Sequence, residues 1–288
     1  MSRLLRAVSA ATFVMSAALS FLAEPVEAAV VHEQGFSAVV LGFRSWYGSY
    51  GMGAIGTAWC VDHGPPAPDP ALDYVPAEID RPAATKQAMA WAVSAHGPGA
   101  DRGTAAAVQL VLHDLMGSRY PSGVLDVDRL QPGHLAGFGG QESQIVDRAR
   151  AIKAEALARS GLQPPLTLEV HVDPVRAGEA GSVLVRVRDA AGAGVPGVPV
   201  RVSASGGSVT SGTEASTDGS GSHRFPLRAG PGNNRFEARA EVPDLALRSF
   251  APRAARAQRV ARPARLHLSA VTGFTAVPPR RLTVVKRG

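Results

Sequence analysis

The chain has 288 residues, of which 45% are hydrophobic and 19% charged, and its formal net charge is +6. This composition is that of folded domains and excludes a chain that is disordered throughout. All the acidic residues precede Leu245, whereas ten of the 30 basic residues follow Leu247. The positive charge therefore belongs to the end of the chain, which excludes a globally basic nucleic-acid-binding domain.

Residues 1–29 have the pattern of a secretory signal peptide. Arg3 and Arg6 precede an apolar run over residues 7–23, and small residues follow up to Ala29. The run is short for a membrane anchor and is interrupted by Ser and Thr, and no later stretch is apolar enough to span a bilayer. We therefore expect a secreted, extracellular protein without a membrane span in its mature form, either released or attached to the cell surface.

Residues 30–162 alternate short strands with helices, which predicts an α+β domain. A strand is expected near Phe36–Phe43, and three helices are expected at 84–95, 105–116 and 142–159. The first helix ends at a Gly-Pro pair, and Thr104 is the expected N-cap of the second.

After residue 165 the hydrophobic period changes to two, with turn clusters between the runs. Residues 166–250 are therefore predicted to form an all-β immunoglobulin-like sandwich. His171 and His223 are interpreted as exposed strand residues rather than metal ligands, and no cofactor or metal site is predicted. Residues 251–288 are predicted to be a basic tail, interpreted as a solvated linker in preference to a patch that binds phosphate-rich wall polymer or nucleic acid. Within this tail, the spacing of Leu266, Leu268 and Val271 suggests a strand, and Leu282–Gly288 resembles the start of a further stalk repeat.

Cys60 is the only cysteine of the chain. An exported protein with one thiol has no intramolecular disulfide partner for it. The thiol is then buried as a small hydrophobe, paired with another chain, or used chemically. As a hydrolase nucleophile it needs a base, for which the candidates are His63, His96, His113 and His134. The prolines that follow Cys60 argue against a helix N-terminus at this nucleophile.

A second chemical use of Cys60 is an internal thioester with a glutamine, formed with release of ammonia. This reaction needs a glutamine held close to the thiol on a rigid element, in a site with little water. Gln109 is a candidate because it interrupts an apolar stretch of the second predicted helix. A glutamine that faces solvent or bonds to the backbone is the commoner explanation of such a residue.

Three motifs in the order Cys, Gln, Gln resemble those of the thioester-domain surface proteins of Gram-positive bacteria. Trp59-Cys60-Val61-Asp62 is similar to the aromatic-Cys-apolar-polar motif of these secreted adhesins. Val108–His113 is aligned with the motif Thr-Gln-any-Ala-Ile/Val-Trp, and Lys86–Ala90 is the counterpart of a middle motif that contains Gln87. The resemblance covers about residues 30–157.

The resemblance implies a thioester-type α+β domain with a Cys60–Gln109 bond, followed by an immunoglobulin-like stalk. Such a protein binds a surface protein or glycan of a host or neighbouring cell covalently, through an amine or a hydroxyl, and turns over no substrate. Asp62, His63 and His113 are candidates for moving protons when a nucleophile opens the thioester. The abundance of Ala, Arg, Gly and Pro hints at an actinobacterial, cell-wall-associated source.

Three substitutions depart from the motif around Gln109: Val108 replaces its Thr, Val111 its Ala and His113 its Trp. Gln87 keeps the Gln and Trp of that motif in its own neighbourhood and is therefore a rival acyl donor. Two alternatives remain open at this stage. One is a secreted cysteine hydrolase that uses Cys60, and the other is a non-covalent surface module with a degenerate thioester site.

Overall fold

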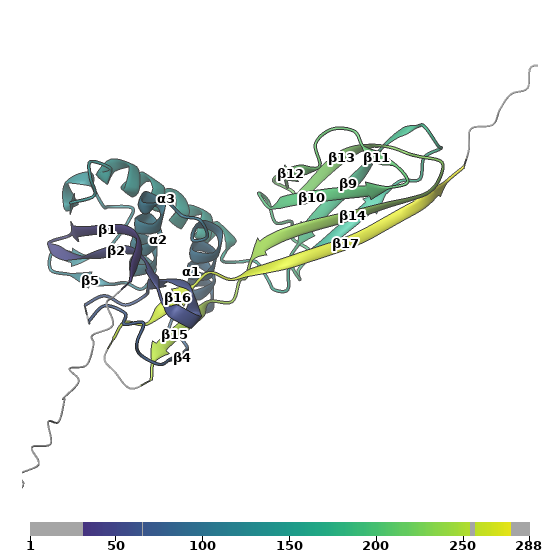
Figure 1. Ribbon diagram of the computed structural model, residues 1–288. Helices are drawn as coiled ribbons and strands as arrows, with labels where there is room; N and C mark the ends of the chain where they lie inside the picture. The colour runs from purple at the N-terminus through teal and green to yellow at the C-terminus, as the bar shows by residue number, and fades with distance from the viewer. Residues whose placement is uncertain (1–30, 65, 254–256, 278–288) are drawn as a thin grey trace, which may run out of the picture.

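The computed structural model describes residues 31–64, 66–253 and 257–277. The predicted signal peptide and the segment Leu282–Gly288 lie outside these residues. The described chain is mostly β, and its helices lie together in the first of two parts seen side by side in Figure 1. The second part is an elongated pair of sheets, along which the strand β17 (Arg265–Ala276) runs.

The first part contains a seven-stranded antiparallel sheet. In spatial order its strands are β4 (Tyr74–Pro76), β15 (Arg248–Pro252), β16 (Val260–Arg262), β3 (Thr57–Cys60), β2 (Phe43–Gly51), β1 (His32–Val40) and β7 (Leu135–Ala136). Short 3-10 turns occur at Gly53–Ile55 and Pro132–His134, and the small hairpin of β5 (Arg119–Tyr120) and β6 (Gly123–Val124) lies apart from this sheet. The expected strand over residues 36–43 is thus two paired strands, β1 and β2, which meet at a tight turn.

The pairing of β1 and β2 depends on two glycines. Gly35 and Gly48 face each other in register and have φ values of 152° and 154°. A Cβ atom on Gly48 would lie 2.0 Å from the carbonyl oxygen of Gln34. This close approach of the two strands is open only to glycine.

The prediction of a basic tail over residues 251–288 is wrong for residues 251–252, 260–262 and 265–276, which lie in strands, and residues 248–250, predicted to belong to the sandwich, lie in the first sheet. β15 and β16 enter the first sheet, and β17 pairs along β14 (Gly232–Pro243) in the second part of the molecule. The basic side chains pair with acids that lie elsewhere in the chain: Arg253 with Asp73, Arg259 with Asp62, and Arg265 with Glu241. Among the described residues, these three arginines therefore belong to ion pairs within the fold rather than to a solvated linker.

Three helices pack beside this sheet: α1 (Ala83–His96), α2 (Arg102–Leu115) and α3 (Glu142–Arg159). The predicted bounds of the third helix are confirmed, and those of the first are correct to within one residue at each end. The second helix begins three residues earlier than predicted. Its N-cap is Asp101, whose carboxylate accepts a hydrogen bond from the Thr104 backbone N–H at 2.6 Å. The predicted N-cap Thr104 therefore lies inside the first turn.

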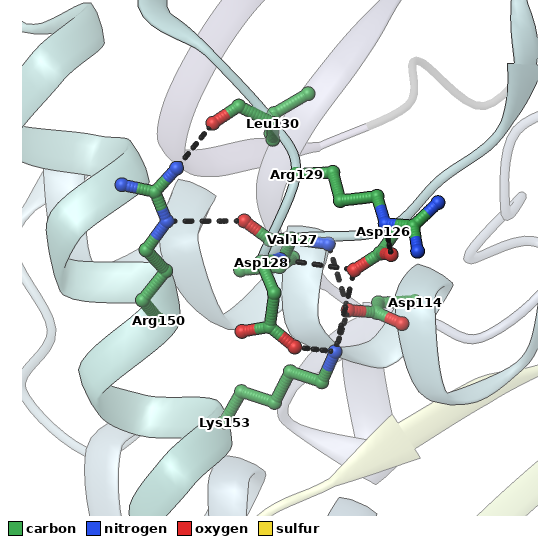
Figure 2. Close-up of polar contacts among 8 residues, drawn as sticks. All are labelled: Asp114, Asp126, Val127, Asp128, Arg129, Leu130, Arg150 and Lys153. Carbon is green, nitrogen blue, oxygen red and sulfur yellow. Dashed lines mark hydrogen bonds and ion pairs between the residues drawn. The ribbon is translucent and has the colours of Figure 1, made fainter.

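An ion cluster ties the end of α2 to α3 and to the loop between them (Figure 2). The Lys153 ammonium on α3 lies 2.7 Å from a carboxylate oxygen of Asp114 on α2 and 2.7 Å from one of Asp128 in the loop. Arg150 also donates to the backbone carbonyl oxygen of Leu130 at 2.6 Å. Because Asp114 directly follows His113, this cluster fixes the end of the helix that carries Gln109 and His113.

Residues 167–243 and β17 form two four-stranded antiparallel sheets. One has the order β12 (Glu214–Ser216), β10 (Pro199–Ser205), β14 (Gly232–Pro243) and β17; the other has β11 (Ser208–Val209), β13 (Ser222–Arg228), β9 (Ala180–Arg188) and β8 (Thr167–Val172). Alternate residues of both sheets are buried in a common core, as in Val183, Val185 and Val187 opposite Val200 and Val202. The period of two in the sequence arises from this alternation.

Candidate functional site

Cys60 is the last residue of the central strand β3. It pairs with Val260 on β16, while the preceding Trp59 pairs with Ser49 on β2. Cys60 is 2% exposed and is a free cysteine. The sequence had placed it at the end of an apolar segment, but the neighbouring strand β16 comes from the end of the chain and could not be anticipated.

Adjacent residues of β3 face opposite sides of the sheet. Trp59 faces the helices, and its indole N–H donates to the carbonyl oxygen of Ala105 on α2 at 3.0 Å. Cys60 packs on the other side in a smaller cluster. The buried members of that cluster are Tyr50, Met52, Ala58, Cys60 and Val260.

Gln109 approaches Cys60 from the helix side. Its side chain is fully buried, and its Nε2 donates to the backbone carbonyl oxygen of Cys60 at 2.7 Å. The same Nε2 lies 2.6 Å from Nε2 of His113, one turn later on α2. Among the described residues, the carboxamide Oε1 has no hydrogen-bond partner. A buried carbonyl oxygen left unpaired costs about 1–3 kcal/mol, so this arrangement calls for a reason beyond stability.

The structure thus brings Cys60 and Gln109 into contact through the backbone of Cys60, with the sulfur packed towards Tyr50. Covalent geometry keeps a cysteine sulfur within about 5 Å of its own carbonyl oxygen. Rotation of the Cys60 side chain about its Cα–Cβ bond changes the position of the sulfur relative to the carboxamide. Because the sulfur packs on the Tyr50 side of the sheet and the carboxamide lies on the helix side, bond formation requires a rearrangement of the end of β3 that turns the Cys60 side chain towards α2.

A directed chain of hydrogen bonds leads away from Gln109. Since the Gln109 amide donates to Nε2 of His113, the proton of this neutral imidazole is assigned to Nδ1, which donates to the Tyr120 hydroxyl at 2.6 Å. Tyr120 is hydrogen-bonded to Tyr47, whose own hydroxyl donates to the carbonyl oxygen of Phe43 at 3.3 Å. From His113 onwards, each donor therefore has one acceptor.

Both histidines near Gln109 favour the neutral form. Burial lowers the pKa of His113 to about 3, and the nearby His63 adds to this effect. Burial also lowers the pKa of His63, whose ring centroid lies 3.8 Å from that of Tyr120. The Nε2 atom of His63 is buried without a hydrogen-bond partner in the described part of the chain.

The thiol of Cys60 is held in its protonated form. Burial raises its pKa far above the ordinary value, the hydrogen bond from the Tyr50 hydroxyl offsets part of this rise, and the Asp62 carboxylate adds to it. A cysteine hydrolase needs the opposite shift, produced by a neighbouring cation or a helix N-terminus. The electrostatics of Cys60 therefore disfavour the hydrolase alternative.

The other histidines considered as bases are engaged elsewhere. His96 lies 3.0 Å from a carboxylate oxygen of Glu155, and the ring of His134 accepts a hydrogen bond from the Gln131 backbone N–H at 3.1 Å. The structure therefore shows His96 and His134 in local contacts of α1 and of the 3-10 turn before β7.

Asp62 is held in an ion pair. Its carboxylate accepts hydrogen bonds from the Arg259 guanidinium at 2.6 Å and 2.9 Å and from the Arg259 backbone N–H at 3.0 Å. Burial alone would raise the pKa of Asp62, but the hydrogen bonds and charge of Arg259 outweigh it, and the pKa is lowered. Asp62 is therefore a carboxylate that fastens β16 beside β3, which leaves it poorly suited to moving protons.

Gln87 makes its polar contacts at a different place from Gln109. Its Nε2 donates to the carbonyl oxygens of Arg159 at 3.1 Å and Leu162 at 2.6 Å, at the end of α3. The carboxamide of Gln87 therefore joins α1 to the chain that leaves α3, whereas that of Gln109 touches Cys60.

Sequence reasoning missed four residues of this site: Tyr47, Tyr50, Tyr120 and Arg259. The two tyrosines of β2 lie three residues apart, so the strand directs them to opposite faces, one towards His113 and one towards Cys60. Tyr120 and Arg259 come from a loop hairpin and from the returning end of the chain. No local pattern marks either of them.

The described residues match neither the pattern of a metal site nor that of a membrane-spanning helix. They contain no group of three or more His, Cys, Asp or Glu side chains arranged to hold a metal ion. None of their helices combines the length and hydrophobicity needed to cross a bilayer.

Comparison with known proteins gives structural similarities only. No protein-family model matches the chain, and a comparison with curated proteins finds no match. The chain is similar to the solved structure of the thioester domain of the Enterococcus faecium TIE86 protein, with 14% identity and a TM-score of 0.31, covering 86% of this chain and 99% of that one.

Two further solved structures are similar. The Bacillus anthracis TIE protein has 12% identity and a TM-score of 0.32, covering 85% of this chain and 47% of that one. The D00-D0 domain of Intimin has 20% identity and a TM-score of 0.26 over 40% of this chain and 49% of that one. The chain thus spans about half of each of these two structures. The solved structures to which this chain is similar include thioester domains of Gram-positive TIE proteins, the class that its motifs resemble.

Proposed function

We propose that this protein is a secreted or surface-displayed, adhesin-like protein in which Cys60 and Gln109 form an internal thioester. Its partner is a surface protein or glycan of a host or neighbouring cell, captured once through an amine or a hydroxyl. The observation that carries the proposal is the fully buried Gln109 carboxamide, which touches Cys60 while its own Oε1 has no hydrogen-bond partner among the described residues.

The bond forms when the Cys60 sulfur attacks the carboxamide carbon of Gln109. The carbon–nitrogen bond breaks, the thiol proton passes to the leaving nitrogen, and one ammonia is released for each thioester formed. Nε2 of His113 lies 2.6 Å from that nitrogen and carries no proton at rest, so it can take up the thiol proton as the sulfur attacks and then pass it to the leaving nitrogen. Both reacting residues are at most 2% exposed, which protects the thioester from hydrolysis.

The rest of the chain supports this role as a scaffold. In the proposed organisation the thioester-type α+β part covers residues 30–162 and is completed by the strands β15 and β16. The paired four-stranded sheets act as an immunoglobulin-like spacer that holds the reactive part away from the producing cell. The predicted signal peptide accounts for export.

Intact-mass measurement of the purified, exported chain tests the proposal. We expect the wild type to be lighter than its sequence by one ammonia and to gain one methylamine on exposure to that amine. Cys60→Ser and Gln109→Glu should abolish both the ammonia loss and the adduct. The matched control Gln87→Glu should keep both.

Two results would overturn the assignment. Full sequence mass in the wild type, with Cys60 resistant to iodoacetamide until the protein is unfolded, would leave a non-covalent module with a buried cysteine. Ammonia loss that survives Gln109→Glu but disappears in Gln87→Glu would transfer the acyl donor to Gln87.

A further inference from the structure

Thioester formation changes the surroundings of His113. Before the reaction, Nε2 of His113 accepts a hydrogen bond from the Gln109 amide at 2.6 Å. The departing ammonia removes that donor, so Nε2 is left as a buried acceptor beside the acyl carbon. On the other side of the ring, Nδ1 stays bonded to the Tyr120 hydroxyl.

Amines and hydroxyls, the two classes of group that can accept the acyl group, differ in their need for a base such as Nε2 of His113. A neutral amine attacks a thioester carbon unaided and loses its proton afterwards. A hydroxyl is a weak nucleophile unless its proton is removed during the attack. A positioned general base contributes about 10²–10⁴-fold to a step of this kind, so it favours hydroxyls far more than amines.

We propose that His113 is the general base that makes a hydroxyl the preferred acceptor of the Gln109 acyl group, with Tyr120 and Tyr47 as positioning residues behind it. This inference rests on the proposed function. It narrows the partner to a molecule that presents hydroxyl groups.

The transfer balances as follows. The hydroxyl oxygen bonds to the acyl carbon of Gln109 while its proton moves to Nε2 of His113. The carbon–sulfur bond breaks, and the sulfur of Cys60 leaves as a thiolate. The imidazolium then returns the proton to this thiolate, which gives an ester on residue 109 and a free thiol.

The surroundings of His113 suit this role. Burial lowers the pKa of the ring, which keeps Nε2 unprotonated at neutral pH but makes the resting imidazole a weak base, so the role given to His113 depends on its position beside the acyl carbon. The charge that the ring gains during the attack is offset by the thiolate that forms beside it and by the Tyr120 oxygen that accepts from Nδ1. The onward bonds through Tyr47 to the Phe43 carbonyl oxygen hold the ring in this tautomer.

The test compares thioester opening by glycerol and by methylamine, followed by intact mass, in four versions of the full-length exported chain. These are the wild type, His113→Gln, Tyr120→Phe and the control His171→Gln, which alters an exposed histidine of β8. The wild type should give the glycerol ester at a rate at least comparable to that of the amide when neutral amine and glycerol are equal in concentration.

We expect His113→Gln to slow ester formation about 100-fold and amide formation less than 10-fold. The rate of ester formation in Tyr120→Phe should lie between those of the wild type and His113→Gln, and both rates should be unchanged in the control His171→Gln. A purely structural role for His113 would lower both rates by the same factor and would overturn the inference. So would a wild type that forms the amide almost exclusively.

If the proposed thioester does not form at all, the mass measurements give a different result from a failure of the role proposed for His113. In that case the wild type shows no ammonia loss, and neither reagent gives an adduct. If His113→Gln itself forms no thioester, the ester-to-amide ratio of Tyr120→Phe against the wild type decides: an unchanged ratio overturns the inference, and a lowered one supports it.

Discussion

The ion pair between Asp62 and Arg259 should contribute measurably to folding, because it joins the end of the chain to the strand that carries Cys60. We propose Arg259→Gln as the perturbation. The two side chains are 22% and 30% exposed, and the guanidinium makes two short bonds to the carboxylate. The variant leaves Asp62 half-buried with only the residue 259 backbone N–H as its donor.

The loss of unfolding free energy expected for Arg259→Gln lies between the values for a fully buried and a fully exposed ion pair. Removing one partner of a fully buried pair costs about 3–5 kcal/mol, whereas an exposed pair contributes about 0–1 kcal/mol. Because the pair is partly exposed and Asp62 keeps its backbone hydrogen bond, Arg259→Gln should lower the free energy of unfolding by about 2 kcal/mol. The matched control is Arg253→Gln, because Arg253 and Asp73 are 68% and 70% exposed and should give less than about 1 kcal/mol.

Urea unfolding at pH 7, monitored by tryptophan fluorescence, measures both variants. The contribution of Asp62 also depends on pH with a known sign. Its pKa is lowered in the folded protein, so the stabilisation is present above the ordinary aspartate pKa of 3.8 and is lost as the pH falls through the folded value. Equal and negligible losses for Arg259→Gln and Arg253→Gln would refute the reasoning and return residues 251–262 to the solvated linker that the sequence suggested.

Three further outcomes are expected. Gly48→Ala should cost at least about 3 kcal/mol, measured by urea unfolding, because its Cβ would meet backbone at 2.0 Å, whereas Gly133→Ala should be nearly neutral since it has open space. Lys153→Met should lose about 2–3 kcal/mol in the same assay, because it strands the 12% exposed carboxylate of Asp114; a loss below 0.5 kcal/mol would contradict the role given to this cluster. His113 is neutral and buried in the folded protein, and burial lowers its pKa to about 3, so its contribution to stability is present above pH 6.5 and is lost as the pH falls towards 3. Between pH 7 and pH 4, the unfolding free energy of His113→Phe should therefore fall less than that of the wild type, by on the order of 2–3 kcal/mol.

The local elements were largely readable from the sequence because they depend on near neighbours in the chain. The apolar spacing of residues 142–159 predicted α3 with its observed bounds, and the period of two predicted the strands after residue 165. The N-cap of α2 was misassigned because Asp101 and Thr104 are both capping residues. Only the hydrogen bond from the Thr104 N–H to the Asp101 carboxylate distinguishes them.

By itself the sequence marked Cys60, Gln109 and His113 as residues of unusual chemistry, since a single cysteine and a glutamine in an apolar helix are visible without a fold. Only the tertiary structure separates the surroundings of the two glutamines, with Gln109 bonded to the backbone of Cys60 and Gln87 to the end of α3. It alone brought Arg259, nearly 200 residues away along the chain, to Asp62. Strand pairing and charge pairing act across space, whereas periodicity and composition report only on neighbours in the sequence.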